Sequence, residues 1–275
     1  MSGETAGEVS GETAGEVSGE TAGEVSGSYA VSGEASGEVS GSEAVSGDDA
    51  VSGQTQGEGR GKPIRKSVKE MHTPVGMARA HLWRPPHARG SLVLGHGAGG
   101  STWSADLRIL TSLTAQGWLV VLVEQPWRVA GRKVATPPAQ LDVAWLAVLA
   151  ALTSGRGRLP RPWVVGGRSA GARVACRTAG AVGADAVLAL SFPLHPPGRP
   201  EKSRASEARL VTGAGIRLAV IQGEKDPFGT PEELRAALGA AAQVTQASGD
   251  HSFTKSPTDV LSATTTFLTN LGTVR

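Results

Sequence analysis

Cysteine and aromatic residues are scarce in this 275-residue sequence, which has one Cys, six Trp, four Phe and one Tyr. Because Cys176 is the sole cysteine, no disulfide can form within the chain, and a reducing compartment is the expected setting. The N-terminal region lacks the apolar run of an ordinary signal peptide, and no stretch approaches the roughly 20 apolar residues of a membrane-spanning helix. We therefore expect a soluble, cytoplasmic protein without a membrane partner.

Basic residues are absent from the first part of the chain. Before Arg60 there are 12 acidic residues and no Lys or Arg, and residues 2–57 are almost entirely Ser, Gly, Glu, Ala, Thr and Val. The unit VSGETAGE recurs every eight residues and then decays into variants such as VSGSEA. A repeat this short cannot bury enough apolar surface to offset the entropy of ordering. We predict a disordered acidic repeat tail at residues 1–61 and one domain at residues 62–275.

The charge is divided unevenly along the chain. The formal net charge is +2, but all 27 basic residues lie from Arg60 onward, against 13 of the 25 acidic residues, so that part carries +14. Such a balance can attract nucleic acid or acidic substrates, or it can belong to a solvated Arg-rich surface. No groove-reading motif is present, so we favour the solvated surface and predict no specific nucleic-acid partner.

Apolar runs alternate with helical patterns over residues 75–271. The segment WLVVLV has the composition of a strand buried on both faces, and residues 231–238 open with Pro and two Glu, as the first turn of a helix prefers. The predicted strands are residues 75–83 (an edge strand), 91–94, 118–123, 163–165, 186–191, 216–221 and 244–247. The predicted helices are residues 104–116, 139–152, a segment ending at 177, 231–238 and 256–271. This alternation predicts an α/β fold with a mostly parallel, doubly wound sheet.

The segment Gly167-Arg168-Ser169-Ala170-Gly171 matches the pattern G-x-S-x-G between the strand WVV and the helical stretch ARVACRTAG. The chemistry requires a sharp turn from strand to helix, with small neighbours on either side of the serine. This turn places the hydroxyl at a helix N-terminus, where backbone N–H groups favour developing negative charge. Gly and Ser are common in this sequence, but the strand before and the helix after make Ser169 the candidate nucleophile.

A serine hydroxyl is a poor nucleophile unless a base takes its proton and an acid orients that base. With the serine on such a turn, the expected chain order is Ser, acid, His. Asp226 in GEKDPFG and His251 in GDHSF each follow a predicted strand, at the edge of the sheet where ligands gather in α/β folds. We predict that Ser169, Asp226 and His251 form a catalytic triad.

Other residues compete for the roles of base and acid. His195 also follows a strand, but it lies among prolines, so we expect it to have a role within its loop. Asp250 is adjacent to His251, and we expect it to support that loop. Glu224 is the fallback acid, two residues before Asp226.

The segment His96-Gly97-Ala98-Gly99-Gly100 follows the strand at residues 91–94 and resembles the HGGG-type segment of esterases. An oxyanion hole needs two backbone N–H groups. We expect one from Ala170, which follows the nucleophile, and the other from Ala98, with Gly97 as the alternative.

The same glycines offer a rival interpretation. Gly95, Gly97 and Gly100 spell G-x-G-x-x-G after a strand, and Glu124 ends the next strand at about the distance of a ribose-binding acid. However, the next helix is predicted to begin at Ser104, beyond the motif, and a dinucleotide fold leaves the proposed triad unexplained. We therefore favour the serine chemistry and expect no cofactor and no metal.

Six segments together carry a family resemblance: HGAGG, EQPWRVAGR, GGRSAGARVA, FPLHPPGRPEKSR, GEKDPFG and GDHSF. Over about residues 73–271 the chain resembles the small α/β-hydrolase-like domain related to dienelactone hydrolase, of the type found in the third subunit of the NSL histone acetyltransferase complex and its testis-expressed relative. The resemblance implies an α/β-hydrolase fold and maps the triad onto Ser169, Asp226 and His251. Dienelactone hydrolases use a Cys nucleophile, so lactone specificity does not carry over to Ser169.

We predict an esterase-like serine hydrolase. Only about 25 residues separate the strand at 186–191 from that at 216–221, which leaves room for at most a small lid. The open mouth suits a small-molecule substrate or an exposed ester, and Arg128, Arg168 and Arg199 suit an anionic group, with Trp127 as a further lining residue. Because some members of the resembling family act in chromatin assemblies, the alternative is a catalytically silent interaction module with a protein partner.

Overall fold

One sheet runs through the computed structural model, which describes residues 63–272. Its strands are β1 (Arg65–Thr73), β2 (Gly76–Arg84), β3 (Gly90–Gly95), β4 (Trp118–Glu124), β5 (Trp163–Arg168), β6 (Ala186–Leu190), β7 (Arg217–Gly223) and β8 (Ala242–Ala247). They lie in the order β1-β2-β4-β3-β5-β6-β7-β8, with β3 to β8 parallel and the pairs β1–β2 and β2–β4 antiparallel. The predicted mostly parallel α/β sheet is confirmed, whereas the predicted tail at 1–61 lies outside the described residues.

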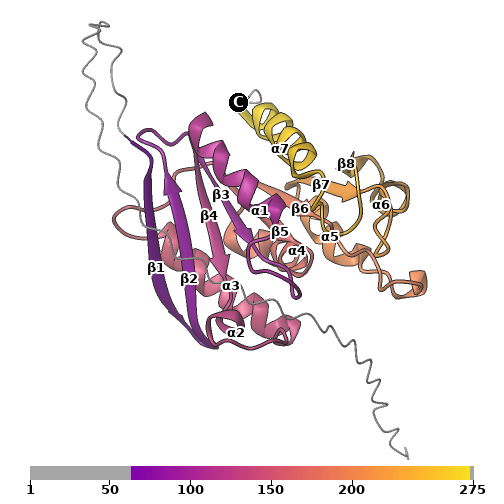
Figure 1. Cartoon of the computed structure of the whole chain (residues 1–275), viewed down its shortest axis with the longest axis horizontal. Coiled ribbons are helices and arrows are strands. Elements are labelled where there is room, and N and C mark those ends of the chain that lie inside the picture. Colours follow the sequence, from indigo (N-terminus) through magenta and orange to yellow (C-terminus); the bar gives the residue numbers. More distant parts are fainter. Residues whose placement is uncertain (1–62, 273–275) are drawn as a thin grey trace, which may run out of the picture. The chain divides into compact units, whose positions relative to one another are not determined.

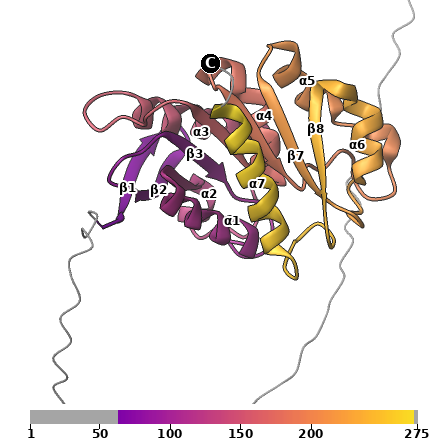
Figure 2. The ribbon, with the colours of Figure 1, turned by 90° about the horizontal axis from the view of Figure 1, so that it is seen from above.

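Helices cover both faces of this sheet (Figures 1 and 2). They are α1 (Ala105–Ile109), α2 (Pro126–Val129), α3 (Pro138–Thr153), α4 (Ala170–Val182), α5 (Ala205–Gly213), α6 (Pro231–Leu238) and α7 (Pro257–Gly272), with short 3₁₀ segments at Leu110–Gln116, Pro200–Lys202 and Gly239–Ala241. Helices α1 and α7 contact each other and pack on one face, and α3, α4, α5 and α6 pack on the other. The predicted doubly wound arrangement is therefore confirmed.

The strand β4 illustrates why the sheet is buried on both sides. Its side chains alternate between two apolar clusters, as the period of two in a strand requires. Leu119, Val121 and Val123 belong to the cluster under α3 and α4, and Val120 and Leu122 belong to the one under α1 and α7. Each fully buried aliphatic side chain contributes about 2 kcal/mol relative to exposure.

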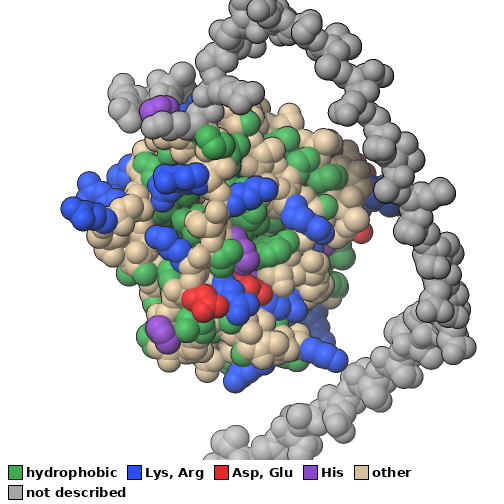
Figure 3. Space-filling view, turned by 60° about the vertical axis from the view of Figure 1, so that its left-hand side comes forward, with side chains coloured by type: hydrophobic (Ala, Val, Ile, Leu, Met, Phe, Trp, Pro, Cys, Tyr) green, Lys and Arg blue, Asp and Glu red, His purple; other side chains and the backbone are tan. Residues whose placement is uncertain are grey.

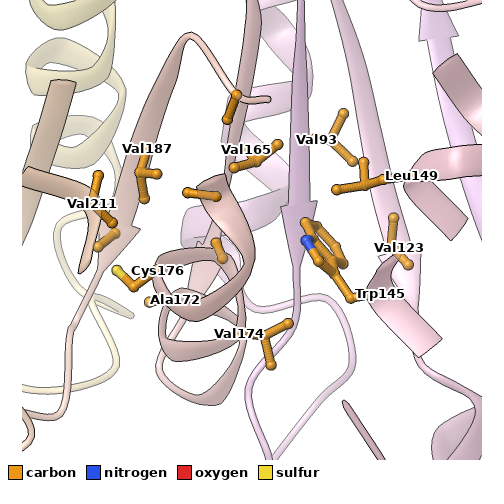
Figure 4. Close-up of a cluster of buried hydrophobic side chains, with 14 of the residues drawn as sticks. Val93, Val123, Trp145, Leu149, Val165, Ala172, Val174, Cys176, Val187 and Val211 are labelled. Carbon is orange, nitrogen blue, oxygen red and sulfur yellow. The ribbon is translucent and has the colours of Figure 1, made fainter. Parts of the chain in front are cut away.

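Part of the core between the sheet and the α3–α4 layer is drawn in Figure 4. Trp145 of α3 is fully buried there, and Val174 and Cys176 of α4 belong to the same apolar cluster as the strand residues Val93 and Val165. Burial raises the pKa of the Cys176 thiol to about 12, so the thiol stays protonated at neutral pH. The single cysteine therefore packs as a small apolar side chain and is not a reactive thiolate.

The N-terminal hairpin corrects the prediction of an edge strand at residues 75–83. That segment is β2, which pairs with β1 on one side and β4 on the other, and the edge strand is β1, which the sequence pattern did not indicate. The segment RKSVKEMHT of β1 is exposed along most of its length and carries charges on both faces. It therefore lacks the apolar alternation that predicts a half-buried strand.

Two helices occupy segments for which no helix was predicted. Helix α2 lies within EQPWRVAGRK and has Pro126 in its first turn, where the missing N–H costs nothing. Helix α5 lies between β6 and β7 and buries only the small side chains Ala205, Ala208 and Val211. The predicted helix at 104–116 is also modified, because α1 ends at Ile109 and the chain continues as a 3₁₀ segment.

Candidate active site

The turn between β5 and α4 holds Ser169 in an unusual backbone conformation, with φ 53° and ψ −111°. Such a conformation costs free energy and persists only where the surrounding structure enforces it. Here the Ser169 N–H donates to the oxygen of Leu190 over 2.9 Å. A β-carbon on Gly167 or on Gly171 would collide with the backbone of Gly95, so both flanking positions require glycine. The G-x-S-x-G pattern is thus explained by close backbone packing.

Three loops at the carboxyl ends of parallel strands bring the predicted triad together. His251 Nε2 lies 2.9 Å from Ser169 Oγ, and His251 Nδ1 lies 2.7 Å from Asp226 Oδ2. The carboxylate of Asp226 only accepts, so Nδ1 carries the proton and Nε2 is free to accept from the serine hydroxyl. The Asp226 side chain is fully buried, whereas that of His251 is 18% exposed. The arrangement can therefore take a proton from Ser169 at a site that a substrate can reach.

Asp226 is held by groups that the sequence did not identify. The side-chain amide of Gln222, which is fully buried at the end of β7, donates to Asp226 Oδ2 over 2.9 Å. The backbone N–H of Phe228 donates to Oδ1 over 2.9 Å. The ring of Phe228 also stacks on His251, with 4.4 Å between ring centroids. The sequence indicated Gln222 only by its position as a polar residue near the end of the buried run RLAVIQG.

The backbone oxygen of His251 accepts two side-chain hydrogen bonds. Arg168 Nη2 donates over 2.8 Å and Ser191 Oγ over 2.9 Å. Arg168 Nε faces the Asp106 carboxylate at 3.5 Å, and Asp106 is completely buried in α1. Burial raises the pKa of Asp106, an effect that Ser104 and the Arg168 charge partly oppose. The guanidinium of Arg168, predicted to bind substrate, thus has two internal partners.

The glycine loop after β3 lies against Ser169, the predicted nucleophile. Ala98 and Ala170, the two predicted oxyanion donors, line one small pocket together with Gly97. A β-carbon on Gly97 would lie 3.6 Å from the β-carbon of Ser169, which shows how closely the loop approaches the elbow. The loop and the start of α4 therefore converge beside the serine, as an oxyanion hole requires.

Beneath this loop lies His96, which is buried. Its Nδ1 donates to the oxygen of Gly97 over 2.8 Å, and its Nε2 accepts from the backbone N–H of Gln125 over 3.1 Å. Burial lowers the pKa of His96 to about 4, and the nearby Arg128 charge adds to the lowering. The neutral imidazole ties the glycine loop to the end of β4, a role that the sequence did not indicate.

The other predicted substrate-binding residues lie around the same sheet edge. Arg128 Nη2 donates to the oxygen of Gly100 over 3.1 Å, and the guanidinium stacks 4.4 Å from the ring centroid of Trp127. Trp127 is buried and lines the pocket beside Ala98. Arg199 is exposed in the connection between β6 and β7. Arg128 and Trp127 therefore brace the glycine loop, and Arg199 faces solvent.

The competing residues have partners elsewhere. His195 Nε2 lies 3.3 Å from Glu233, and Asp250 accepts from the backbone N–H of Ser252, a contact that holds its loop. Glu224 lies 3.7 Å from Lys225. Glu124, the candidate ribose-binding acid, lies 3.8 Å from His81 and 3.9 Å from Arg79, and α1 begins at Ala105, beyond the glycines. The dinucleotide interpretation is not favoured.

Basic side chains are spread over the face seen in Figure 3, where acidic side chains are few. Some arginines are nevertheless paired inside the molecule. Glu207 of α5 accepts hydrogen bonds from Arg173 and Arg177 of α4, and Arg177 also donates to Asp142 of α3. These two arginines lower the pKa of Glu207 despite its burial. The network joins helices α3, α4 and α5.

A family model described as an alpha/beta hydrolase domain matches residues 88–269. Similar solved structures include a lidless α/β serine hydrolase from Xanthomonas campestris (17% identity, TM-score 0.57, covering 76% of this chain and 98% of that one). An esterase from Pyrococcus furiosus has 16% identity and a TM-score of 0.59, with 75% and 93% covered. Dienelactone hydrolase from Anabaena variabilis has 16% identity and a TM-score of 0.58, with 74% and 95% covered. At these identities the likeness concerns the fold.

None of the curated proteins compared with the chain matches it. Within residues 63–272, no helix has the length and apolar character needed to cross a membrane.

Proposed function

This chain belongs to the alpha/beta hydrolase domain family, and from that premise we propose that it is a serine hydrolase that cleaves carboxylic esters. Ser169 is the nucleophile, His251 the general base and Asp226 the acid that orients the base. The observation that carries the proposal is the row of hydrogen bonds from Ser169 through His251 to Asp226, with lengths of 2.9 and 2.7 Å. The enforced turn at Ser169 supports the same assignment, because strained serines occur where function requires them.

The reaction begins with attack of Ser169 Oγ on the ester carbonyl while His251 Nε2 takes the hydroxyl proton. The imidazolium that results is stabilised by Asp226, whose carboxylate lies on Nδ1. As the tetrahedral intermediate collapses, His251 returns the proton to the departing alcohol. Water then attacks the acyl-serine with His251 again as base, which releases the carboxylic acid and restores Ser169.

The oxyanion of the tetrahedral intermediate is proposed to bind the backbone N–H groups of Ala170 and Ala98. Both residues line the pocket beside the elbow. Loss of one such donor typically lowers turnover by roughly a hundredfold or more. The buried contact of His96 and the exposed hydrogen bond of Arg128 with the glycine loop hold it in place before substrate arrives, which reduces the cost of reorganisation.

The proposed substrate is a small ester, or an ester exposed on a larger molecule, and it can carry an anionic group. The solvent-exposed Arg199 and the guanidinium of Arg128, near the glycine loop, supply positive charge at this edge of the sheet. Trp127 is proposed to form a wall of the site. For Arg168 we propose that Nη2 and Nε support the site, because they face His251 and Asp106. The remaining nitrogen, Nη1, is proposed to contact the substrate.

A fluorophosphonate probe tests the proposal, because it reacts with a serine that has an adjacent base. We expect the wild-type protein to be labelled and Ser169→Ala not to be labelled. Ser112→Ala, which changes an exposed serine on the 3₁₀ segment after α1, is the matched control and retains labelling. A folded wild-type protein that stays unlabelled contradicts the proposal.

The same experiment separates the alternatives. Kinship with the chromatin-associated relatives is proposed on the resemblance of the segments quoted above, and it motivates an interaction module with a protein partner. Unlabelled but folded wild type supports that module, and a rise in melting temperature with NAD(P) supports a dinucleotide site. We also propose that residues 62–275 form the catalytic domain behind a separate acidic tail and that the protein acts in the cytoplasm.

A further inference from the structure

Asp106 is a buried carboxylate that the proposed mechanism does not use. It lies in the first turn of α1, and its side chain is completely buried. A carboxylate in such a place is costly unless a cation compensates its charge. Among the described residues, only Arg168 forms an ion pair with it, with Arg168 Nε 3.5 Å from Asp106 Oδ2. The buried carboxylate therefore favours one position of the Arg168 guanidinium.

The guanidinium of Arg168 contacts three separate segments around the site. Beside the contact with α1, its Nη2 donates to the backbone oxygen of His251 over 2.8 Å. Its Nη1 lies against the glycine loop, 2.9 Å from the position that a β-carbon on Gly97 would take. Arg168 directly precedes Ser169 at the end of β5, and its side chain is only 13% exposed. One planar group therefore links α1, the glycine loop and the loop of His251 to the elbow.

The shape of the guanidinium makes these contacts depend on one another. Its nitrogens lie in one rigid plane, so a rotation that moves Nε away from Asp106 also moves Nη2 away from His251. A second donor, Ser191 Oγ, reaches the same oxygen of His251 over 2.9 Å, but it carries no charge. Hydrogen bonds from a charged donor are roughly twice as strong as those between neutral groups. The stronger of the two contacts on this oxygen is therefore the one from Arg168.

From these contacts we propose that Asp106 is a positioning residue for the base His251. Asp106 holds the guanidinium of Arg168, the guanidinium holds the backbone of His251, and the imidazole is thereby kept in line with Ser169 Oγ. This inference rests on the proposed function and adds to it a residue of α1 that makes no hydrogen bond with the triad. Because a misplacement of about 1 Å can lower a rate about a hundredfold, and Ser191 still holds the loop, the expected loss without Asp106 is roughly tenfold or more.

The test measures, on the full-length protein, the rate constant for labelling of Ser169 by an uncharged fluorophosphonate, and kcat and KM for p-nitrophenyl acetate. Neither reagent carries an anionic group for Arg168 Nη1 to bind. We expect Asp106→Asn to lower the labelling rate constant and kcat by roughly tenfold or more and to leave KM within about twofold of wild type. Unfolded molecules lower the amplitude of labelling and not its rate constant, so partial unfolding does not mimic this result.

Asp142→Asn is the matched control. Asp142 also pairs with an arginine, Arg177 of α4, over 2.6 Å, and its side chain is only 22% exposed. Arg177 donates to Asp142 and Glu207 and not to the loop of His251. We therefore expect this variant to be less stable than wild type but to be labelled at the wild-type rate.

A double variant separates positioning from stability. Arg168→Met combined with Asp106→Asn has no unpaired buried charge, so it is expected to be more stable than Arg168→Met alone. Because Asp106 acts through Arg168, the added Asp106→Asn change restores none of the reactivity, and the double variant is labelled as slowly as Arg168→Met. The double variant also serves if Asp106→Asn alone does not fold, since it too is expected to react roughly tenfold more slowly than wild type.

The outcomes distinguish this inference from the proposed function. If Ser169 of the folded wild type is not labelled, the proposed function fails, and Asp106 has no base to position. If wild type is labelled and folded Asp106→Asn reacts equally fast, only the positioning role is refuted. Reactivity that returns with stability in the double variant, or an equal loss of reactivity in Asp142→Asn, also overturns that role.

Discussion

Replacing His96 by Gln is expected to remove much of the pH dependence of stability between pH 7 and pH 5. His96 is buried under the glycine loop, and its pKa is lowered from 6.5 to about 4, chiefly by burial. In the unfolded chain the imidazole takes up a proton near pH 6.5, whereas the folded protein resists protonation. The stability that His96 contributes is therefore fully present above pH 6.5 and is lost as the pH falls toward 4.

The size of the effect follows from the two pKa values. A difference of about 2.5 pKa units corresponds to about 3 kcal/mol of unfolding free energy across the whole window. About 2 kcal/mol of this is lost between pH 7 and pH 5. Glutamine keeps an N–H for the oxygen of Gly97 but does not titrate, so the variant lacks this slope.

Urea titrations of wild type and His96→Gln at pH 7 and pH 5 measure the effect. The difference between the two proteins is the informative quantity, because other groups titrate in both. Asp106, whose raised pKa acts in the opposite direction as the pH rises, cancels in that difference. Unfolding free energies that run parallel in the two proteins from pH 7 to pH 5 would refute the reasoning.

Three further substitutions probe the site. Asp226→Asn is expected to lower kcat by roughly 10⁴-fold, because an amide no longer holds His251 in the required tautomer; ester hydrolysis measures it. Arg168→Met is expected to lower the unfolding free energy by about 3 kcal/mol, since Asp106 loses its cation, and adding Asp106→Asn should restore part of the loss in urea titrations. Gly171→Ala is expected to cost about 2 kcal/mol in thermal unfolding, because its β-carbon meets the backbone of Gly95.

Each of these has a contrary outcome. Full turnover in Asp226→Asn excludes the carboxylate from the mechanism. An Arg168→Met variant that is not rescued at all by Asp106→Asn shows that the buried ion pair is not the source of the loss. A Gly171→Ala protein with an unchanged melting temperature means that the elbow tolerates a side chain there.

The parallel part of the fold was predictable because its signals are local. The run WLVVLV is apolar on both faces, and its residues enter two different core clusters on alternate positions. Helix α6 spans residues 231–238 as predicted from Pro231 and the two glutamates of its first turn, and Thr230 and Glu233 form a capping box there. The local sequence of such elements indicates where they begin and end.

The elements that were missed depend on tertiary contacts. Strand β1 is charged and exposed, and only pairing with β2 gives it an extended conformation. Helix α5 buries three small side chains, and its Glu207 pairs with Arg173 and Arg177 of α4. Neither element has an apolar pattern strong enough to indicate it.

The same distinction between local signals and tertiary contacts applies to the candidate site. The order of Ser169, Asp226 and His251 after successive strands was visible in the sequence, but their distances came only from the structure. The groups that support them were not predicted, because each contact joins distant segments. Arg168 reaches His251, 83 residues further along the chain, and His96 reaches Gln125, 29 residues away.

The separation of the proposed nucleophile from its proposed base has a consequence for the folding of the chain. Ser169 and His251 are 82 residues apart and meet only when β7 and β8 have joined the sheet. Under the proposed mechanism, Ser169 in an incompletely folded molecule lacks its base and is an ordinary alcohol that does not attack esters. The fraction of molecules that the fluorophosphonate probe labels at Ser169 is therefore expected to report the fraction whose C-terminal half has folded.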